Sequence, residues 1–444
     1  MNADQNHRLT QTGLGTSAGQ LLRHYWQPVA LLDELEGDRP VRPVTVLGQS
    51  LVLFRDEQGR LGLIDRDCPH RGADLAYGRI EDGGLRCPFH GWLFDATGQC
   101  IQTPAEPIGS KLCTRIKQRN YLIEVKNGIV WAWLGDEGST PSIFPKLDCF
   151  EAPASHVFAF KGYLDCNWVQ ALEVGIDPAH ASFLHRFFED EDTGSAYGKQ
   201  FRGASADSSM PMTRVLREFD RPHIEIESTE YGMRLFARRE ITPDLMHVRV
   251  TNCVFPQAFN IPLSATMHIT QWHVPIDDTR CYWYALFTSF TDPIDKPLMR
   301  EQRLQLYALP DYMPRLNRAN QWGYNALEQK NQTYTGMGFD INVHDAWAVE
   351  SQGKIQDRTR EHLGTTDKAI MAYRRLMFKA MDDVAAGNLP FMFLSESQAA
   401  AITGPITVDG MSATSHWQTY WRAADAKRRQ DAPWQVTQAV SVQV

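Results

Sequence analysis

Two short motifs, Cys68-Pro-His70 and Cys87-Pro-Phe-His90, decide the fold of the first part of this 444-residue chain. Each motif carries one thiol and one imidazole, and 16 residues lie between them. Arg71-Gly72 follows the first motif and Gly91-Trp92 follows the second. Because each cysteine precedes a proline, which lacks an N–H and resists helix, we expect both motifs to lie in loops.

Two thiols and two imidazoles on paired loops are the ligand set of a Rieske cluster, in which cysteines hold one iron of a 2Fe-2S centre and histidines hold the other. The neutral imidazoles raise the reduction potential above that of an all-cysteine cluster. A Cys2His2 zinc site uses the same ligand types. Zinc fingers, however, usually group their cysteines and their histidines separately, whereas each arm here carries one of each. The pattern favours a cluster held by Cys68, His70, Cys87 and His90.

Short alternating or β-branched runs surround these motifs from about Val41 to Trp133. Turn sequences of the hairpin type, such as Asp56-Glu-Gln-Gly59 and Lys126-Asn-Gly128, separate the runs. Glycine, serine and proline gather at Gly135–Pro141 without an apolar period, which indicates a domain boundary. The sequence therefore predicts an all-β first domain over residues 1–140.

Residues 141–444 mix strand-like and helical sequence. Strand-like stretches such as His247–Thr251 and Cys281–Phe287 precede helix-rich sequence from about Asp345 to Ala385. Strands in one block with helices beside them predict an α+β catalytic domain with an antiparallel sheet flanked by helices. Residues 189–211 are acidic and then rich in glycine, serine and alanine, and we expect a mobile loop there.

Composition excludes several classes of protein. The apolar fraction of 43 % and the charged fraction of 22 % are ordinary for a globular chain. A net charge of −8 without a long basic block argues against nucleic-acid binding. We find no apolar window of about 18 residues and no signal-peptide core in the polar first segment, so we expect a cytoplasmic protein without membrane spans. The eight cysteines are then expected to stay reduced or to bind metal.

A second group of possible metal ligands lies in the segment from Asn167 to His185, which contains Asp177, Pro178 and His180. Histidines at i and i+5 lie about 140° apart on a regular α-helix, so they face one metal only where the helix is interrupted. Pro178 supplies such an interruption. Two imidazoles and one carboxylate with open positions form the facial triad of non-haem Fe(II) oxygenases. Histidines of the surface or core are the ordinary alternative, but a mononuclear iron would consume the single electrons that a Rieske cluster supplies.

The carboxylate of such a triad has to come from another part of the chain. One late helical region offers several candidates, namely Asp345, Glu350, Asp357, Glu361 and Asp367. Spacing does not choose between them, and a solvated helix face is the ordinary explanation for any one of them.

From Leu21-Leu-Arg-His-Tyr-Trp-Gln-Pro28, through both metal motifs, to Arg358–Asp367, the chain resembles the Rieske non-haem iron aromatic-ring oxygenases. Within that family it resembles the oxygenase components of the phthalate dioxygenase group. The resemblance implies that Asp345 is the third iron ligand, beside His180 and His185. It also implies that Asp177 links a Rieske histidine of one subunit to an iron-ligand histidine of the next.

The chain departs from many relatives at Val174, where they have a polar residue three positions before the linking acid. This departure concerns the details of the proton and electron relay and leaves the metal ligands as assigned.

The resemblance further implies a head-to-tail homotrimer or a hexamer of two stacked trimers. It implies a cytoplasmic reductase that carries a flavin and a plant-type 2Fe-2S domain and is fed by NADH or NADPH. The chain shows no glycine-rich nucleotide fingerprint, which agrees with a separate reductase. The implied reaction uses O2 to dihydroxylate an aromatic carboxylate. The alternatives are O-demethylation or monooxygenation of methoxylated or biaryl acids and, from another class, an electron-transfer Rieske protein.

A substrate carboxylate in an apolar pocket is expected to pair with an arginine. Arg249 is the first candidate, followed by Arg202 and Arg214 beside the predicted mobile loop. An arginine on a strand more often reaches solvent or a surface acid. Several aromatic residues could line the pocket or only pack in the core, namely Phe183, Phe187, Phe188, Trp272 and Trp283.

Overall fold

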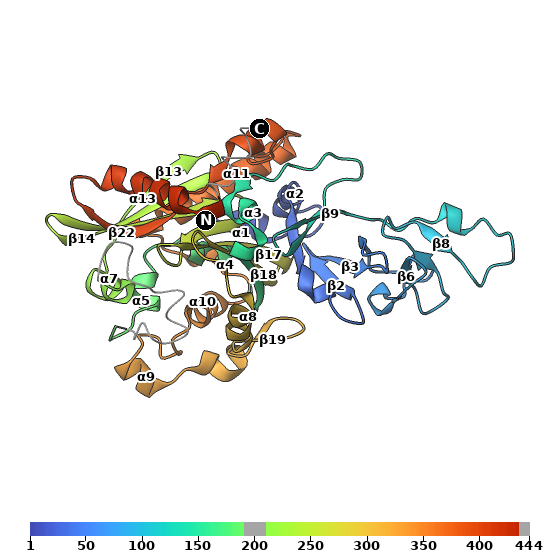
Figure 1. The fold of residues 1–444 in the computed structure, drawn as a ribbon, viewed down its shortest axis with the longest axis horizontal. Helices are drawn as coiled ribbons and strands as arrows, with labels where there is room; N and C mark the ends of the chain where they lie inside the picture. The colour runs from blue at the N-terminus through green and yellow to red at the C-terminus, as the bar shows by residue number, and fades with distance from the viewer. Residues whose placement is uncertain (191–209, 435–444) are drawn as a thin grey trace. The chain divides into compact units, whose positions relative to one another are not determined.

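The computed structural model describes residues 1–190 and 210–434, and Figure 1 traces their helices and strands. The chain forms two compact units. The small unit comprises Gln11–Ser142 and Val274–Asp278, and the large unit comprises Met1–Thr10, Ile143–His273 and the residues from Thr279 onward. The first ten residues thus group with the large unit, whereas the sequence analysis places them in the first domain.

The small unit is built of antiparallel β-sheets, as its alternating sequence predicts. One sheet contains β1 (Gln27–Leu31), β10 (Ile129–Trp133) and β9 (Leu122–Lys126). A second contains β2 (Val41–Val46), β3 (Gln49–Arg55) and β4 (Leu61–Asp65). A third contains β5 (Arg79–Glu81), β6 (Gly84–Arg86), β7 (Leu93–Phe94) and β8 (Cys100–Gln102). Helix α2 (Ser17–Leu22) and the short 3-10 helices η1 (Leu32–Leu35), η2 (Leu75–Tyr77) and η3 (Cys113–Arg115) complete it.

The core of the small unit reaches the two cysteine motifs. Phe54 and Phe94 are fully buried, and they belong to the same hydrophobic cluster as Leu85, Cys68 and Cys87. Both cysteines are therefore anchored in packed side chains rather than in solvent.

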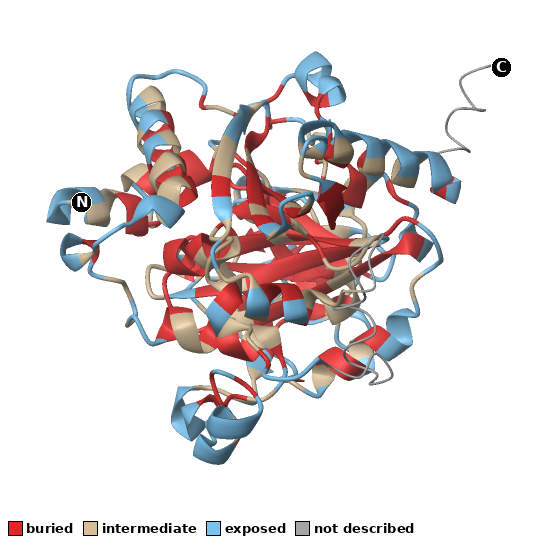
Figure 2. Cartoon of the chain, turned by 90° about the vertical axis from the view of Figure 1, so that its left-hand side faces the viewer, coloured by how far each residue is buried: buried red, intermediate tan, exposed pale blue. Residues whose placement is uncertain are grey.

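The large unit is organised around one eight-stranded antiparallel sheet. Its strand order is β12 (Val157–Leu164), β18 (Arg280–Ser289), β17 (Met267–Asp277), β16 (Ala258–Pro262), β15 (Leu245–Val254), β14 (Gly232–Thr242) and β13 (His223–Thr229), and β22 (Val408–Ala413) pairs with β15. Figure 2 shows these strands buried while the surrounding helices keep exposed outer faces. Short strand pairs are β11 (Lys146–Leu147) with β21 (Thr403–Gly404), and β19 (Tyr307–Ala308) with β20 (Met313–Pro314).

Helices flank this sheet. They are α1 (Ala3–Thr10), α3 (Asp148–Glu151), α4 (Trp168–Gly175), α5 (Ala181–Leu184), α7 (Met212–Glu218), α8 (Lys296–Leu304), α9 (Ala326–Asn331), α10 (Ile341–Glu350), α11 (Lys368–Ala385), α12 (Glu396–Ala401) and α13 (Trp417–Asp431). The 3-10 helices are η4 (Ala154–His156), η5 (Arg318–Gly323), η6 (Arg358–Arg360) and η7 (Thr365–Asp367). The predicted fold class, an all-β first part followed by an α+β part, is confirmed.

The late helical region differs from the prediction in detail. Helix α10 begins at Ile341, where the side chain of Asp340 accepts a hydrogen bond from the N–H of Asn342. It ends at Glu350, and Gly353 follows with a φ of +94°, a conformation that L side chains rarely adopt. The predicted helical stretch is therefore two α-helices with a break between them. Most of the predicted mobile loop lies outside the described residues.

Candidate metal centres

The two cysteine motifs of the small unit form loops of the same construction. In each, the cysteine N–H donates to a carbonyl five residues on at 2.8 Å, and the cysteine carbonyl accepts from a glycine N–H four residues on. These glycines, Gly72 and Gly91, adopt φ values of +70° and +75°, which explains why neither position carries a side chain. The local sequence thus closes each loop around its own cysteine, Cys68 or Cys87.

The four candidate ligands meet as two pairs. The rings of His70 and His90 lie 4.4 Å apart between centres at 75°. Burial, together with the neighbouring thiol of Cys87, raises the pKa of Cys68 to about 11. Both cysteines are free of disulfides. The Nδ1 atom of His90 is buried and has no hydrogen-bond partner, as expected of a nitrogen placed to bind metal.

This arrangement fits a two-iron cluster better than a single zinc ion. A tetrahedral zinc site with bonds of about 2.0–2.3 Å needs its four ligand atoms within about 4 Å of one another. Among the described residues, the metal-ligand atoms of three or more such side chains lie within 4.8 Å of one another only at His180, His185 and Asp345. The two cysteines and two histidines therefore do not converge on one point, whereas a 2Fe-2S centre separates thiolate and imidazole ligands on different irons.

The histidine side of this site carries aromatic neighbours. The ring of His70 stacks on Trp92 with 4.5 Å between centres, and Phe89 lies 3.9 Å from the ring of His90. Phe89 is 54 % exposed, and Arg71 lies over its ring. The cysteines are thus buried in the core, while the imidazoles lie toward the outside of the unit.

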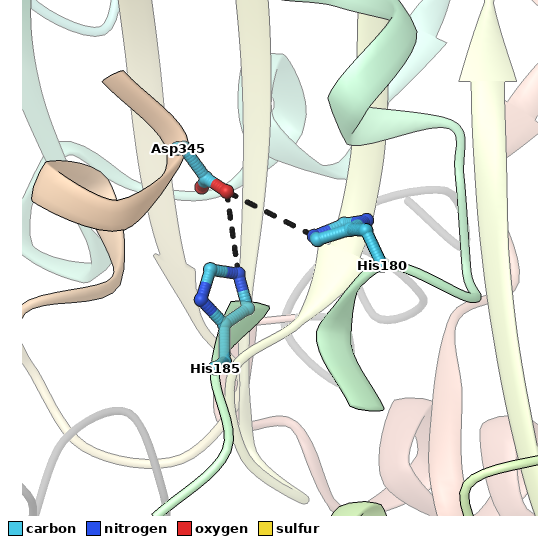
Figure 3. A group of neighbouring side chains, drawn as sticks. All are labelled: His180, His185 and Asp345. Atoms are coloured by element: carbon cyan, nitrogen blue, oxygen red, sulfur yellow. Dashed lines mark ion pairs between the residues drawn. The ribbon is translucent and has the colours of Figure 1, made fainter. Parts of the chain in front are cut away.

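The second centre lies in the large unit at the predicted helix interruption. Helix α4 ends at Gly175, and the single-turn helix α5 is flanked by His180 before it and His185 after it. Their rings lie 5.1 Å apart at 84°. Asp345 projects from α10, and its Oδ1 lies 3.8 Å from Nε2 of His180 and 3.3 Å from Nε2 of His185 (Figure 3).

The electrostatics of this group suit a cation. Burial alone would raise the pKa of Asp345, but His185 and His180 outweigh it, so the pKa lies below its ordinary value and the carboxylate is ionised at neutral pH. Its Oδ1 is buried without a hydrogen-bond donor. Two imidazoles, one carboxylate and an acceptor without a donor are the donor set of the facial triad that holds Fe(II) in oxygenases.

The other four acids of the late region are engaged elsewhere. Glu350 accepts from the N–H of Asp165 at 3.0 Å and from Trp322 at 2.9 Å, and Glu361 binds Arg374. The remaining two close local turns, Asp357 through the N–H of Thr359 and Asp367 through the N–H of Gly364. These hydrogen bonds and the ion pair distinguish the four acids from Asp345, a distinction that their spacing in the sequence does not provide.

Asp177 lies beside the triad. Its Oδ2 is 4.0 Å from Nδ1 of His180, and its Oδ1 accepts from the N–H of Ala179 at 2.8 Å. The backbone carbonyl of Asp177 is also hydrogen-bonded to His180 Nδ1. Asp177, the acid predicted to link two centres, thus contacts one of the two candidate iron-ligand histidines.

A cavity of about 210 Å³ opens beside the triad. His180, His185, Asp345 and Asp177 line it, together with Val174 and other mainly apolar side chains. Of the five aromatic residues considered, Phe187 and Trp283 line this cavity. Phe183 and Phe188 are 44 % and 37 % exposed, and Trp272 stacks on Phe150.

The three candidate arginines occupy different surroundings. Arg249 lines the cavity, but it is ion-paired with Asp409, and its Nη2 donates to a backbone carbonyl at 3.1 Å. Arg214 is half exposed, pairs with Glu218 at 3.0 Å and does not line the cavity. Arg202 lies outside the described residues.

Arg239, which was not among the predicted site residues, lines the same cavity and is only 2 % exposed. Its Nε donates to the carbonyl of Phe219 at 2.9 Å, its Nη2 donates to the hydroxyl of Ser182 at 3.2 Å, and its Nη1 has no partner. Burial, with Arg249 nearby, lowers its pKa to about 10. The alternation of side chains along a strand could have identified it, because this alternation places Arg239 on the same face of β14 as the buried Leu235 and Ala237.

Comparisons with known proteins agree with both centres. Residues 25–115 match the Rieske [2Fe-2S] domain family, and residues 132–443 match the family described as LigXa C-terminal domain like. The chain is 33 % identical to the phthalate 4,5-dioxygenase oxygenase subunit of Pseudomonas putida, covering 87 % of this chain and 88 % of that protein. It is 30 % identical to the 5,5'-dehydrodivanillate O-demethylase oxygenase subunit of a Sphingobium species, covering 88 % and 82 %.

The fold also matches a solved structure, NdmA of Pseudomonas putida CBB5 with caffeine, with a TM-score of 0.58 at 18 % identity over 85 % of this chain and 97 % of that chain. None of the helices in residues 1–190 and 210–434 is both long enough and apolar enough to cross a membrane. The predicted oxidoreductase, with its Rieske cluster, its mononuclear iron and its use of O2, is confirmed by the family matches and by the related oxygenase subunits. The chain belongs to the Rieske oxygenase family, as the terminal oxygenase component of a multi-component system.

Proposed function

We propose that this oxygenase dihydroxylates an aromatic carboxylate and draws its electrons from a separate reductase carrying a flavin and a 2Fe-2S domain. The observation that carries the proposal is Arg239, a buried guanidinium in the wall of the apolar cavity beside the iron ligands. The relationship to a phthalate dioxygenase subunit supports the same substrate class.

A buried charge without a directly paired acid is costly, and among the described residues only Asp409 and Asp220, neither of which pairs with it directly, offset that of Arg239, so an anion in the cavity would stabilise it. Its two engaged nitrogens donate to neutral acceptors, and no ion pair joins it to an acid within the described part of the chain. A carboxylate of the substrate can accept from the remaining Nη1 donor, a charge-assisted hydrogen bond in a site shielded from water.

Arg249 is less suited to that role because Asp409 already neutralises it. Burial would raise the pKa of Asp409, but His247 and Arg249 together hold it well below its ordinary value. We therefore assign the carboxylate to Arg239 and treat the pair of Arg249 and Asp409 as a polar wall that orients the ring.

The remaining site residues would either bind a metal centre or orient a residue that does. Cys68, His70, Cys87 and His90 would hold the cluster, and His180, His185 and Asp345 would hold Fe(II). When bound, the iron supplies the activation of O2 with electrons that arrive one at a time from the cluster.

Asp177 holds the Nδ1 side of His180, and we propose that it links this ligand to a Rieske histidine of the neighbouring subunit. That role requires a head-to-tail homotrimer or stacked hexamer. We also propose a cytoplasmic location, where NAD(P)H feeds the reductase.

The test is the kinetics of Arg239→Met with phthalate and with its neutral diamide, using a purified reductase. Methionine fills the space of the stem and leaves no buried charge. Losing a buried charged partner typically costs about 2–5 kcal/mol, so we expect kcat/KM for the acid to fall by about 30-fold or more while the value for the diamide stays within a few-fold.

Arg214→Met is the matched control and should leave both substrates unchanged, because this arginine pairs on the surface. An equal loss for acid and diamide would contradict a carboxylate contact. Product mass tests the reaction itself, since dihydroxylation adds two oxygens and two hydrogens.

O-demethylation of a methoxylated aromatic acid is the second candidate, favoured by the relationship to the dehydrodivanillate O-demethylase subunit. Methoxybenzoates would then lose CH2 and release formaldehyde. Arg239 would have the same role in either reaction, because both substrate classes carry a carboxylate.

A further inference from the structure

We propose that His344 is a positioning residue that fixes the tautomer of the iron ligand His185. The inference rests on the proposed metal role of His180, His185 and Asp345. His344 precedes Asp345 on α10 and is 0 % exposed, and the sequence analysis did not single it out. Its ring stacks beside that of His185, with 5.6 Å between centres at 24°.

The hydrogen bonds of His344 determine which of its nitrogens carries a proton. Its Nε2 lies 2.9 Å from the carbonyl oxygen of Gly338. A carbonyl oxygen only accepts hydrogen bonds, so Nε2 of His344 is the N–H donor. In the neutral ring the other nitrogen, Nδ1, is then an acceptor.

That acceptor faces the iron ligand. Nδ1 of His344 lies 3.3 Å from Nδ1 of His185, so the proton between them belongs to His185. With its proton on Nδ1, His185 presents the lone pair of Nε2 to the metal. The same Nε2 lies 3.3 Å from Oδ1 of Asp345, on the side where the triad converges.

The two ligand histidines are therefore oriented by different means. His180 places its Nδ1 against the backbone carbonyl of Asp177, whereas His185 depends on a side chain. Metal-binding histidines generally need such a partner on the second nitrogen, and its loss typically weakens metal binding by about 10–100-fold. Substitution can therefore remove the hydrogen-bond partner of His185, whereas it leaves the backbone carbonyl that His180 contacts in place.

Three substitutions separate hydrogen bonding from packing. His344→Asn keeps an acceptor oxygen close to the position of Nδ1, so it still accepts from His185. His344→Gln keeps a polar group near the position of Nε2, toward Gly338, but offers nothing at Nδ1. His344→Phe keeps the volume and the stacked ring without any acceptor.

The measurement is the Kd of Co(II) for the full-length protein, with its Rieske cluster intact and its mononuclear metal removed by a chelator. Competition with a chelating dye gives Kd, and EPR of the bound Co(II), with the cluster oxidised, reports the ligand field. We expect His344→Gln and His344→Phe to weaken binding by about 10–100-fold and to change the EPR spectrum. His344→Asn should stay within about threefold of the wild type.

His156→Phe is the control for replacing a buried histidine of the large unit, because its two nitrogens contact Ser155 and a backbone carbonyl away from the cavity. It should leave the Co(II) affinity unchanged. Wild-type affinity and spectrum in His344→Phe would overturn the proposal, as would equal losses in His344→Asn and His344→Gln. If His344→Phe fails to fold, the Asn and Gln pair still decides. If the triad itself bound no Co(II) in the wild type, the proposed metal role would fail instead, so the two failures are distinct.

Discussion

The two metal centres differ in how far apart in the chain their ligands lie. The proposed cluster ligands come from two short loops that close on their own backbone, through Gly72 and Gly91. The proposed triad takes two ligands from the turn around α5 and its third, Asp345, from α10, far along the chain. A centre of the first kind is readable from a motif, whereas a centre of the second kind exists only after the large unit has folded.

The largest effect is expected from removing a ligand that one of the two short loops supplies, which tests whether the two centres form independently. Cys87→Ser should abolish the 2Fe-2S absorption and reduce turnover below detection, since no electrons then reach the catalytic iron. The mononuclear site should still bind one iron, because it belongs to the other unit. Visible absorption and iron per chain measure both effects.

Cys100→Ser is the matched control, a buried cysteine of the same hydrophobic cluster that is outside the motifs. It should keep the cluster. If Cys87→Ser retained the absorption of the wild type, the cluster would have other ligands.

The second test removes the distant ligand. Asp345→Asn should lower iron from about three to about two per chain and stop product formation, while the cluster absorption stays, because a neutral amide binds Fe(II) poorly. Iron analysis and single-turnover product yield give the answer.

Glu350→Gln serves as its control, because Glu350 lies on the same helix but is hydrogen-bonded to Asp165 and Trp322. This variant should be less stable than the wild type but should contain the same amount of iron per chain. The reverse pattern, with iron lost only in Glu350→Gln, would move the third ligand to Glu350.

The smallest expected effect concerns the stability of the large unit, on which the proposed iron site depends. Glu173 on α4 is buried and binds Arg358 and Arg374, residues distant in sequence. Glu173→Gln leaves these buried guanidiniums without their charge partner, which costs about 3–5 kcal/mol. Thermal unfolding should therefore show loss of mononuclear iron at lower temperature, with the cluster less affected.

The pH dependence follows from the same contact. Burial would raise the pKa of Glu173, but the two arginines hold it below its ordinary value of 4.5. A lowered carboxyl pKa contributes stability that is present above that ordinary value and is lost as the pH falls through the folded-state pKa. Below pH 4.5 the wild type should therefore lose stability more steeply than Glu173→Gln.

Glu218→Gln is the control, since Glu218 pairs with Arg214 at the surface and such pairs contribute only about 0–1 kcal/mol. Identical acid profiles for the wild type and Glu173→Gln would contradict this account of α4.

The same contrast explains what the sequence could predict. The fold class and the cluster loops follow from strand periodicity, turn residues and two compact motifs. The proposed third iron ligand does not, because five acids lie in the late region and only their contacts in the folded chain, such as that of Glu350 with Trp322 and that of Glu361 with Arg374, separate them. The resemblance to a family supplied that choice.

The arginine that would bind the substrate was the hardest residue to predict, because its role also depends on contacts formed only in the folded chain. Arg249 is the arginine on the most evident strand, but Asp409, on β22, neutralises it. Arg239 and its neighbour Arg238 look alike in sequence, and only the alternation of the strand turns one inward and leaves the other to pair with Glu225. The role of an arginine therefore depends on distant acids that no local pattern reports.

One guanidinium joins the cavity to the iron ligands. Arg239 donates to the hydroxyl of Ser182, and Ser182 lies on the short turn between His180 and His185. In the proposed complex, the substrate carboxylate and this hydroxyl would accept from the same guanidinium. Replacing Arg239 would therefore remove a contact to this turn as well as a charge from the cavity wall.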